Sequence, residues 1–340
     1  MHIPEDRKLR EFCGHVGSDP MLTQAAGGNV SVKVEDELWV KASGTWLADA
    51  LNRDIFVPVD LSALHDQIQR RVFDYTPVAL GPSRLRPSIE TMMHACMPHR
   101  YVVHLHAIEP LAILVRDDPE VELQRSLAGV SFDWRLLPYS KPGGPLSRDI
   151  ALALSPRDDV ECLLLRNHGV VFGGETLDRV FEMICETRER LHDAARVVTS
   201  MRESEWRFEP GLVGWRSPQN QSLHALATHP ELLSRLRSDW ALSPDHVVFL
   251  GDKPVIVSTA LSLSRLPDAT QVAFVAGEGV ALRAGHKAGL EEQLTAYLNV
   301  IERQQPSQSL TSLSHEQVAE LLNWDAERYR VSLQGVSRIL

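Results

Sequence analysis

Three histidines have residue types and spacing that could bind a metal ion, and each of them ends an apolar run. His104 and His106 lie one residue apart in the stretch VVHLHAIEP, residues 102–110. Residues i and i+2 of a strand point to the same face, so both imidazoles can approach one ion at a strand's end. A catalytic zinc usually takes three protein ligands. His168 is the strongest third ligand, because it also ends an apolar strand and precedes Gly169, which permits a close approach.

Other metal-enzyme families that use a His-x-His pair fit the neighbouring residues less well. A metallo-β-lactamase-like site would place an acid and then a histidine directly after the pair, where this chain has Ile108 and Glu109. Cupins place their glutamate later than Glu109 and surround it with strands only, whereas helical patterns flank this pair. An amidohydrolase barrel would begin at its His-x-His strand, and the residues after His106 fall slightly short of the roughly 250 of a whole barrel. The barrel is the best of these alternatives.

The composition favours a small-molecule partner. The 340-residue chain carries a net charge of −10, and no stretch concentrates Lys and Arg as a surface for nucleic acid or anionic membrane would. The N-terminus lacks the apolar core of a secretory signal, and no later window is apolar enough for a membrane span. We therefore expect a soluble, cytoplasmic protein that binds neither nucleic acid nor membrane. Its length suggests a main domain with an extension.

Hydrophobic periodicity predicts one mixed α/β unit over residues 1–202. Val30, Val32 and Val34 alternate with polar residues and precede an acidic turn, which predicts a hairpin with the next strand. The other predicted elements are a helix over 6–16, a short helix from Ser88 with Glu90 in its first turn, a strand over 101–106, a helix from Glu109 followed by irregular sequence, a helix near 147–155, two strands within 160–174 and a long amphipathic helix over 175–198.

The rest of the chain carries no chemical motif that we can identify. Residues 203–221 lose periodicity, which predicts a connector. Residues 222–340 are predicted to form a small α+β extension. Within it, HVVFLGDKPVIV and QVAFVAGEGVALRAG predict strands with turns, whereas residues 287–303 and 315–323 predict helices.

Four segments in this order resemble the class II aldolase/adducin family over roughly residues 8–200: GGNVSVKVEDELWVKASGT, RPSIETMMHA, VVHLHAIEP and CLLLRNHGVVFGGETLDRVFEMICE. Four ordered motifs are more specific than any one of them. The region after residue 220, with THPELL, SPDHVVFLGDKPVIV and VALRAG, resembles the extension that follows the aldolase part of bifunctional rhamnulose-1-phosphate aldolase/alcohol dehydrogenase proteins. The sequence has no Gly-x-Gly-x-x-Gly after a strand to indicate the dehydrogenase part itself.

The resemblance implies a three-layer α/β/α sandwich with a central, mainly antiparallel sheet, and a homotetramer with active sites at subunit interfaces. It matches His104, His106 and His168 to the family's zinc ligands. Three neutral imidazoles leave the charge of Zn²⁺ uncompensated, so the ion can polarise a ketose carbonyl and stabilise an enediolate. It also matches Glu90 to the glutamate that completes the metal shell and acts as acid or base. A dry site would raise the pKa of this carboxylate for proton transfer; alternatively, Glu90 complements a helix dipole.

The resemblance also maps a phosphate pocket to turns and a helix start that offer backbone N–H groups and hydroxyls, at Gly28, Asn29, Ser43, Gly44 and Ser88. Many relatives have a second serine before the glutamate, and Ile89 in that place removes one hydroxyl. Lys41 would add positive charge to the pocket or face solvent from its strand. The tyrosine that donates a proton in aldolases of this family has no counterpart that we can place.

These residues predict a zinc-dependent class II aldehyde-lyase that cleaves a phosphorylated ketose or a related sugar derivative through an enediolate. Epimerisation of a sugar phosphate, and decarboxylation or dehydration of a sugar acid, pass through similar anions, so the same site supports them. A non-catalytic, adducin-like binding or assembly module is the alternative from a different class. The histidines and Glu90 argue against it, because a scaffold has no need of an empty tri-histidine site.

Overall fold

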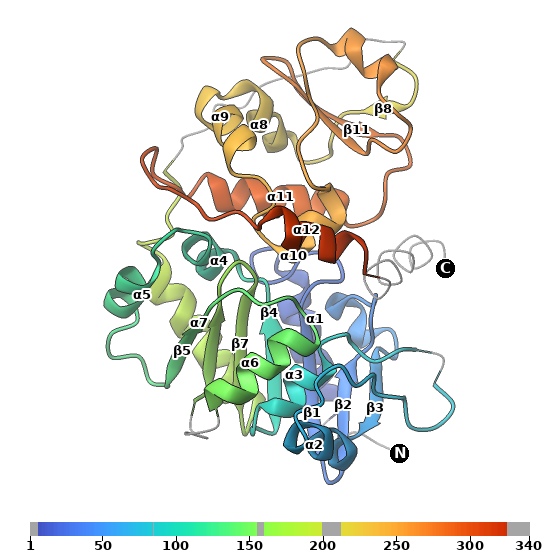
Figure 1. The fold of residues 1–340 in the computed structure, drawn as a ribbon, viewed down its shortest axis with the longest axis vertical. Helices are drawn as coiled ribbons and strands as arrows, with labels where there is room; N and C mark the ends of the chain where they lie inside the picture. Colours follow the sequence, from blue (N-terminus) through green and yellow to red (C-terminus); the bar gives the residue numbers. More distant parts are fainter. Residues whose placement is uncertain (1–5, 84, 155–159, 199–211, 325–340) are drawn as a thin grey trace.

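The structure, a computed structural model, describes residues 6–83, 85–154, 160–198 and 212–324. The N-terminal part is built on a seven-stranded sheet and the C-terminal part on a four-stranded sheet. Figure 1 shows the two sheets at opposite ends of the long axis, with helices of the C-terminal part between them.

The large sheet is mainly antiparallel, as the sequence predicts. Every pair of neighbouring strands is antiparallel except the last two, which are parallel. From edge to edge the strands are β3 (Phe56–Asp60), β2 (Glu37–Lys41), β1 (Asn29–Val34), β4 (Tyr101–Leu105), β7 (Gly169–Gly174), β6 (Cys162–Leu165) and β5 (Trp134–Leu137).

Helices cover both faces of this sheet, which makes the N-terminal part the expected three-layer sandwich. Alternate residues of β4 enter opposite cores, Val103 on one face and Val102 on the other. The Val103 face packs against α1 (Asp6–Ser18), α4 (Ile108–Leu114), α5 (Glu120–Ser126) and α7 (Leu177–Leu191). The opposite face packs against α2 (Leu61–Gln69), α3 (Thr91–Cys96) and α6 (Gly144–Leu154), which Figure 1 shows in front of the sheet.

The C-terminal part is α+β and shares a core with the large unit. Ile108, Leu111 and Val115 lie in or next to α4 and belong to the same buried cluster as the C-terminal helices. The small sheet has the order β8 (Trp215–Arg216), β11 (Gly279–Arg283), β10 (Val272–Val275) and β9 (Ile256–Val257). The helices are α8 (Ala225–Thr228), α9 (Pro230–Ser238), α10 (Pro244–Leu250), α11 (Leu290–Ile301) and α12 (His315–Leu322).

Several local predictions differ from the structure. The strand predicted at HVVFL is helix α10, in which Ser243 caps the first turn by accepting a hydrogen bond from the backbone N–H of His246. The helix predicted from Ser88 begins at Thr91, so Glu90 is its N-cap and not a first-turn residue. The segment after the helix from Glu109, which the sequence analysis predicts to be irregular, contains α5. Strand β8 lies within the predicted connector, of which residues 203–211 fall outside the described residues.

None of the helices in the described part of the chain has both the length and the apolar character that crossing a membrane requires.

Candidate metal centre

The three predicted histidines lie where two neighbouring strands of the large sheet meet. His104 is in β4, His106 follows that strand, and His168 lies in the turn between β6 and β7. Strands β4 and β7 are antiparallel, with Leu105 opposite Val170, so the start of β7 lies beside the end of β4. Glycine is required at position 169, because a Cβ there would lie 2.3 Å from the carbonyl oxygen of Leu105.

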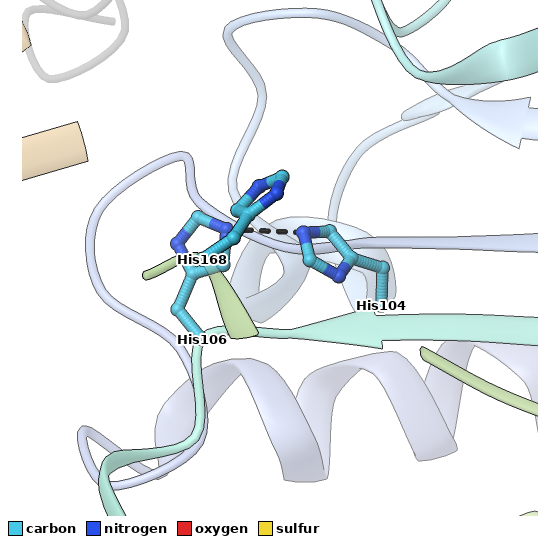
Figure 2. Close-up of side chains that lie close together, drawn as sticks. All are labelled: His104, His106 and His168. Carbon is cyan, nitrogen blue, oxygen red and sulfur yellow. Dashed lines mark hydrogen bonds between the residues drawn. The ribbon is translucent and has the colours of Figure 1, made fainter. Parts of the chain in front are cut away.

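The three imidazole rings face one another in a buried cluster (Figure 2). The Nε2 atoms of His104 and His106 are 3.1 Å apart, the contact that Figure 2 draws as a dashed line. One ligand nitrogen from each histidine lies within 4.8 Å of the other two. Zinc–nitrogen bonds of about 2.0–2.1 Å in a tetrahedral arrangement separate nitrogens by about 3.3 Å. The spacing of the His104 and His106 nitrogens is therefore close to that of a zinc site.

The hydrogen bonds of Nδ1, the ring nitrogen that points away from the cluster, fix the tautomers of His104 and His106. His104 Nδ1 lies 3.0 Å from the carbonyl oxygen of Val170, and His106 Nδ1 lies 3.2 Å from Asp245 Oδ2. Both partners accept, so both Nδ1 atoms carry the proton and both Nε2 atoms present lone pairs. Two buried lone pairs 3.1 Å apart repel each other unless a proton or a metal cation lies between them. Burial lowers the pKa of His104 and that of His168, to about 3 for His168, which keeps both neutral.

Glu90 faces the same cluster from the start of α3. Its Oε2 is 3.7 Å from His104 Nε2, and its Oε1 is 3.4 Å from His168 Nε2. Oε1 is buried and accepts no hydrogen bond from the described residues, which leaves it available to a metal or a substrate. Burial raises the pKa of Glu90, whereas the positive charge of a protonated His104 or His168 and the hydrogen bond from Asn29 lower it. Because both histidines are neutral, the Asn29 amide is the contribution that favours the carboxylate form of Glu90, and the expected rise stays a prediction.

A chain of buried side chains holds Glu90 in place. His94 bonds Ser31 Oγ through Nδ1, at 2.7 Å, and Asn29 Oδ1 through Nε2. Fixed in this orientation, the Asn29 amide donates to Glu90 Oε2 at 2.8 Å and to Ser88 Oγ at 3.3 Å. His94 lies among core residues as a satisfied imidazole, yet it orients the amide that binds the candidate catalytic carboxylate.

Of the five residues predicted to bind phosphate, the structure places two in one cavity. Ser43 and Ser88 line a cavity of about 750 Å³, which Ser88 connects to Glu90 through Asn29, and the Ser43 hydroxyl is buried with no hydrogen-bond partner among the described residues. Gly28 and Asn29 lie on the histidine side: Gly28 has φ +66°, and a Cβ there would lie 2.8 Å from the carbonyl oxygen of His104. Gly44 has φ +78° and follows Ser43, but it does not line the cavity.

Lys41 is buried and does not face solvent. Its Nζ donates to the carbonyl oxygens of Ala26, at 3.0 Å, and Thr45, at 2.6 Å. It therefore ties together the two turns that hold the predicted phosphate-binding residues.

The sequence analysis missed site residues from the C-terminal part. Asp245, in the first turn of α10, contacts His106, and Trp324 lines the cavity together with Tyr75. The Ser-Pro-Asp start of α10 was a detectable signal, because Ser as N-cap, Pro at the first helical position and an acid in the first turn favour a helix. No local pattern indicates that this helix reaches the metal cluster.

Comparisons with known proteins concern the N-terminal part. Residues 7–194 match the family described as the class II aldolase and adducin N-terminal domain. The chain is 29% identical over 198 residues to a Bacillus subtilis protein named uncharacterized oxidoreductase YuxG. That match covers 52% of this chain and 28% of the relative, so the chain spans well under half of that protein.

Three similar solved structures also cover little more than half of the chain. The N-terminal class II aldolase domain of a Thermoplasma acidophilum protein is 24% identical, with a TM-score of 0.49, over 58% of this chain and 96% of that one. YgbL of Klebsiella pneumoniae, titled a putative aldolase/epimerase/decarboxylase, is 22% identical, with a TM-score of 0.41, over 55% and 87%. The L-fuculose-1-phosphate aldolase of Thermus thermophilus is 22% identical, with a TM-score of 0.38, over 56% and 95%.

Proposed function

The chain belongs to the class II aldolase and adducin family, and from this premise we propose that it is a zinc-dependent aldehyde-lyase that cleaves a phosphorylated ketose or a related sugar derivative by retro-aldol chemistry. The observation that supports catalysis is the buried 3.1 Å approach of the Nε2 atoms of His104 and His106, beside His168 and the unpaired Oε1 of Glu90. A binding module has no physical need for this buried, mutually repelling set of acceptors.

His104, His106 and His168 would hold the metal through neutral imidazoles, and Glu90 lies within reach of the same position. A bound Zn²⁺ supplies a Lewis acid that stabilises the negative charge developing on substrate oxygens. Glu90, held as an anion, takes the proton from the hydroxyl next to the bond that breaks. It then returns this proton to the carbon of the enediolate that cleavage leaves.

The cavity that Ser88 connects to Glu90 supports a phosphorylated substrate. Ser43 and Ser88 line it, and the buried hydroxyl of Ser43 lacks a partner among the described residues, whereas Ser88 Oγ accepts a hydrogen bond from Asn29. A phosphate oxygen would accept a hydrogen bond from that hydroxyl, which removes the cost of leaving it buried and unpaired. The volume of about 750 Å³ is ample for a sugar phosphate.

Metal analysis and an aldolase assay test this proposal together. The protein is purified without added metal, its bound metal is quantified, and release of dihydroxyacetone phosphate from ketose 1-phosphates is followed for the wild type, His106→Ala and Glu90→Gln. We expect close to one zinc per chain in the wild type, a large loss of zinc in His106→Ala, and zinc without turnover in Glu90→Gln. Zinc-free wild type, or equal zinc in wild type and His106→Ala, would refute the metal site.

The same experiment separates the rival activities. Zinc binding without cleavage of any ketose 1-phosphate would favour epimerisation of a sugar phosphate or decarboxylation or dehydration of a sugar acid at this site. Unchanged turnover in Glu90→Gln would remove Glu90 from the reaction. The homotetramer with sites at subunit interfaces, the cytoplasmic location and the domain boundaries stay predictions from the sequence.

A further inference from the structure

The C-terminal part places one carboxylate against the outer side of the metal cluster. Asp245 Oδ2 lies 3.2 Å from His106 Nδ1, the ring nitrogen that faces away from the cluster. Only 7% of the His106 side chain and 5% of the Asp245 side chain are exposed. The space beside this contact is a cavity of about 20 Å³, enough for about one water molecule.

Buried polar groups from three parts of the chain fix this contact. Gln293 of α11 directs its amide nitrogen to Asp245 Oδ2, at 3.3 Å, and to the carbonyl oxygen of Gln24, at 3.4 Å. Gln24 in turn donates to the carbonyl oxygen of His106, at 3.3 Å. The carboxylate and the imidazole are therefore held by partners on both sides of the boundary between the two parts.

The backbone of the N-terminal part also makes room for the contact. A Cβ at position 27 would lie 2.8 Å from His106 Nδ1 and 2.9 Å from Asp245 Oδ2. Any side chain other than glycine would therefore push the two groups apart. This close approach is a second observation, independent of the hydrogen bonds, that the chain is built around the pair.

A carboxylate in this place controls what the other nitrogen of the ring can do. The carboxylate accepts a hydrogen bond from Nδ1–H, which leaves Nε2 as the lone-pair nitrogen, raises the basicity of the ring and fixes its orientation. The other two histidines differ: His104 Nδ1 donates to a backbone carbonyl, and His168 Nδ1 has no partner among the described residues. His106 is thus the one histidine of the three whose outer partner carries a charge.

We propose that Asp245 is a positioning residue for His106, so that the C-terminal part completes the metal centre of the N-terminal part. This inference rests on the proposed metal site, but it does not depend on which reaction the site catalyses. It assigns the C-terminal part a role in the chemistry, in addition to burying apolar surface.

The test compares zinc affinity in Asp245→Ala, Asp245→Asn and the wild type, by competition with a chromophoric chelator. Loss of an outer-shell partner typically weakens metal binding 10–100-fold, and we expect a loss in that range for Asp245→Ala. Asparagine keeps the shape, and its amide oxygen can still accept a hydrogen bond from His106 Nδ1–H without carrying a charge, so Asp245→Asn should lose less affinity. The cobalt-substituted proteins should show a shifted visible absorption band in Asp245→Ala, because the ligand field changes.

Gln304→Ala is the matched control for the contact between the two parts. Gln304 is buried in the C-terminal part, accepts from Arg116 Nε at 3.0 Å and donates to the carbonyl oxygen of Ala112 at 2.8 Å, away from the histidines. It should reduce the free energy of unfolding without changing zinc affinity. A second readout needs no metal: in the metal-free wild type, nuclear magnetic resonance should detect the proton of His106 on Nδ1, and Asp245→Ala should show a mixture of tautomers.

The outcomes separate this inference from the proposed function. Wild-type zinc affinity in Asp245→Ala, or an equal loss in Gln304→Ala, would overturn the positioning role while the metal site stands. A selective loss in Asp245→Ala, in a protein that binds zinc but cleaves no ketose 1-phosphate, would support the positioning role and refute the lyase proposal. Wild-type protein that binds no zinc would overturn both.

Discussion

Asn29 offers the sharpest test of how the site is held together, because the sequence and the structure assign it different tasks. The resemblance to class II aldolases places it in a phosphate pocket, whereas its amide nitrogen donates to Glu90 at 2.8 Å and its amide oxygen contacts His94. In Asn29→Ala, Glu90 loses a hydrogen bond to a charged group, worth about 1.5–3 kcal/mol, and the buried His94 Nε2 loses its partner, at about 1–3 kcal/mol.

We therefore expect Asn29→Ala to lower the free energy of unfolding of the metal-free protein by about 2.5–6 kcal/mol, measured by urea denaturation. Freed from the amide, Glu90 should lose its alignment. A displacement of about 1 Å can reduce turnover about 100-fold, so kcat should fall while KM for a ketose 1-phosphate changes little. A variant that binds phosphate less well would show the opposite pattern, with a raised KM.

Ser31→Ala is the matched control, because Ser31 bonds the same His94, at 2.7 Å, but does not reach Glu90. It should also destabilise the protein, by about 1–3 kcal/mol, since His94 Nδ1 would be left buried and unpaired. Turnover should stay close to the wild-type value. Equal losses of kcat in the two variants, or a raised KM with unchanged kcat in Asn29→Ala, would refute the view that the Asn29 amide aligns Glu90.

Three further predictions follow from the same geometry. Ser43→Ala should leave the free energy of unfolding within about 0.5 kcal/mol of the wild type, because the hydroxyl that it removes is unpaired. The same change should raise KM for a ketose 1-phosphate about 10–100-fold. An unchanged KM in steady-state kinetics would contradict phosphate binding at Ser43. Gly27→Ala, with a methyl group 2.8 Å from His106 Nδ1, should weaken zinc binding about 10-fold or more in chelator competition, unlike Gly14→Ala, whose methyl group meets only a flexible leucine side chain. Burial lowers the pKa of His246 to about 3 from its ordinary 6.5, so between these pH values the unfolded chain binds a proton that the folded protein does not. The free energy of unfolding therefore falls as the pH falls through this window, by up to about 1.4 kcal/mol per pH unit for this group. Urea denaturation at pH 7, 6 and 5 should show a smaller pH dependence in His246→Gln, and an identical dependence would count against this assignment.

The elements of the N-terminal part were predictable because their signals are local. Alternating apolar and polar residues predicted the hairpin of β1 and β2, and apolar runs next to the histidines predicted β4, β6 and β7. Helical spacing of apolar residues predicted α7. The errors also have local causes. The apolar run HVVFL has no periodicity that separates a buried helix from a strand, and only its Ser-Pro-Asp start favours the helix that forms.

The sequence by itself determined which side chains could bind a metal and that two of them share a face, because a strand's period of two places His104 and His106 together whatever packs around them. It also determined, through four ordered motifs, the family of the N-terminal part. Only the tertiary structure decided how these groups are held. The pairing of β4 with β7 sets the position of His168, and the packing of the C-terminal helices on α4 brings Asp245 to His106. Such contacts depend on how whole elements bury their apolar faces, and no local spacing in the chain records them.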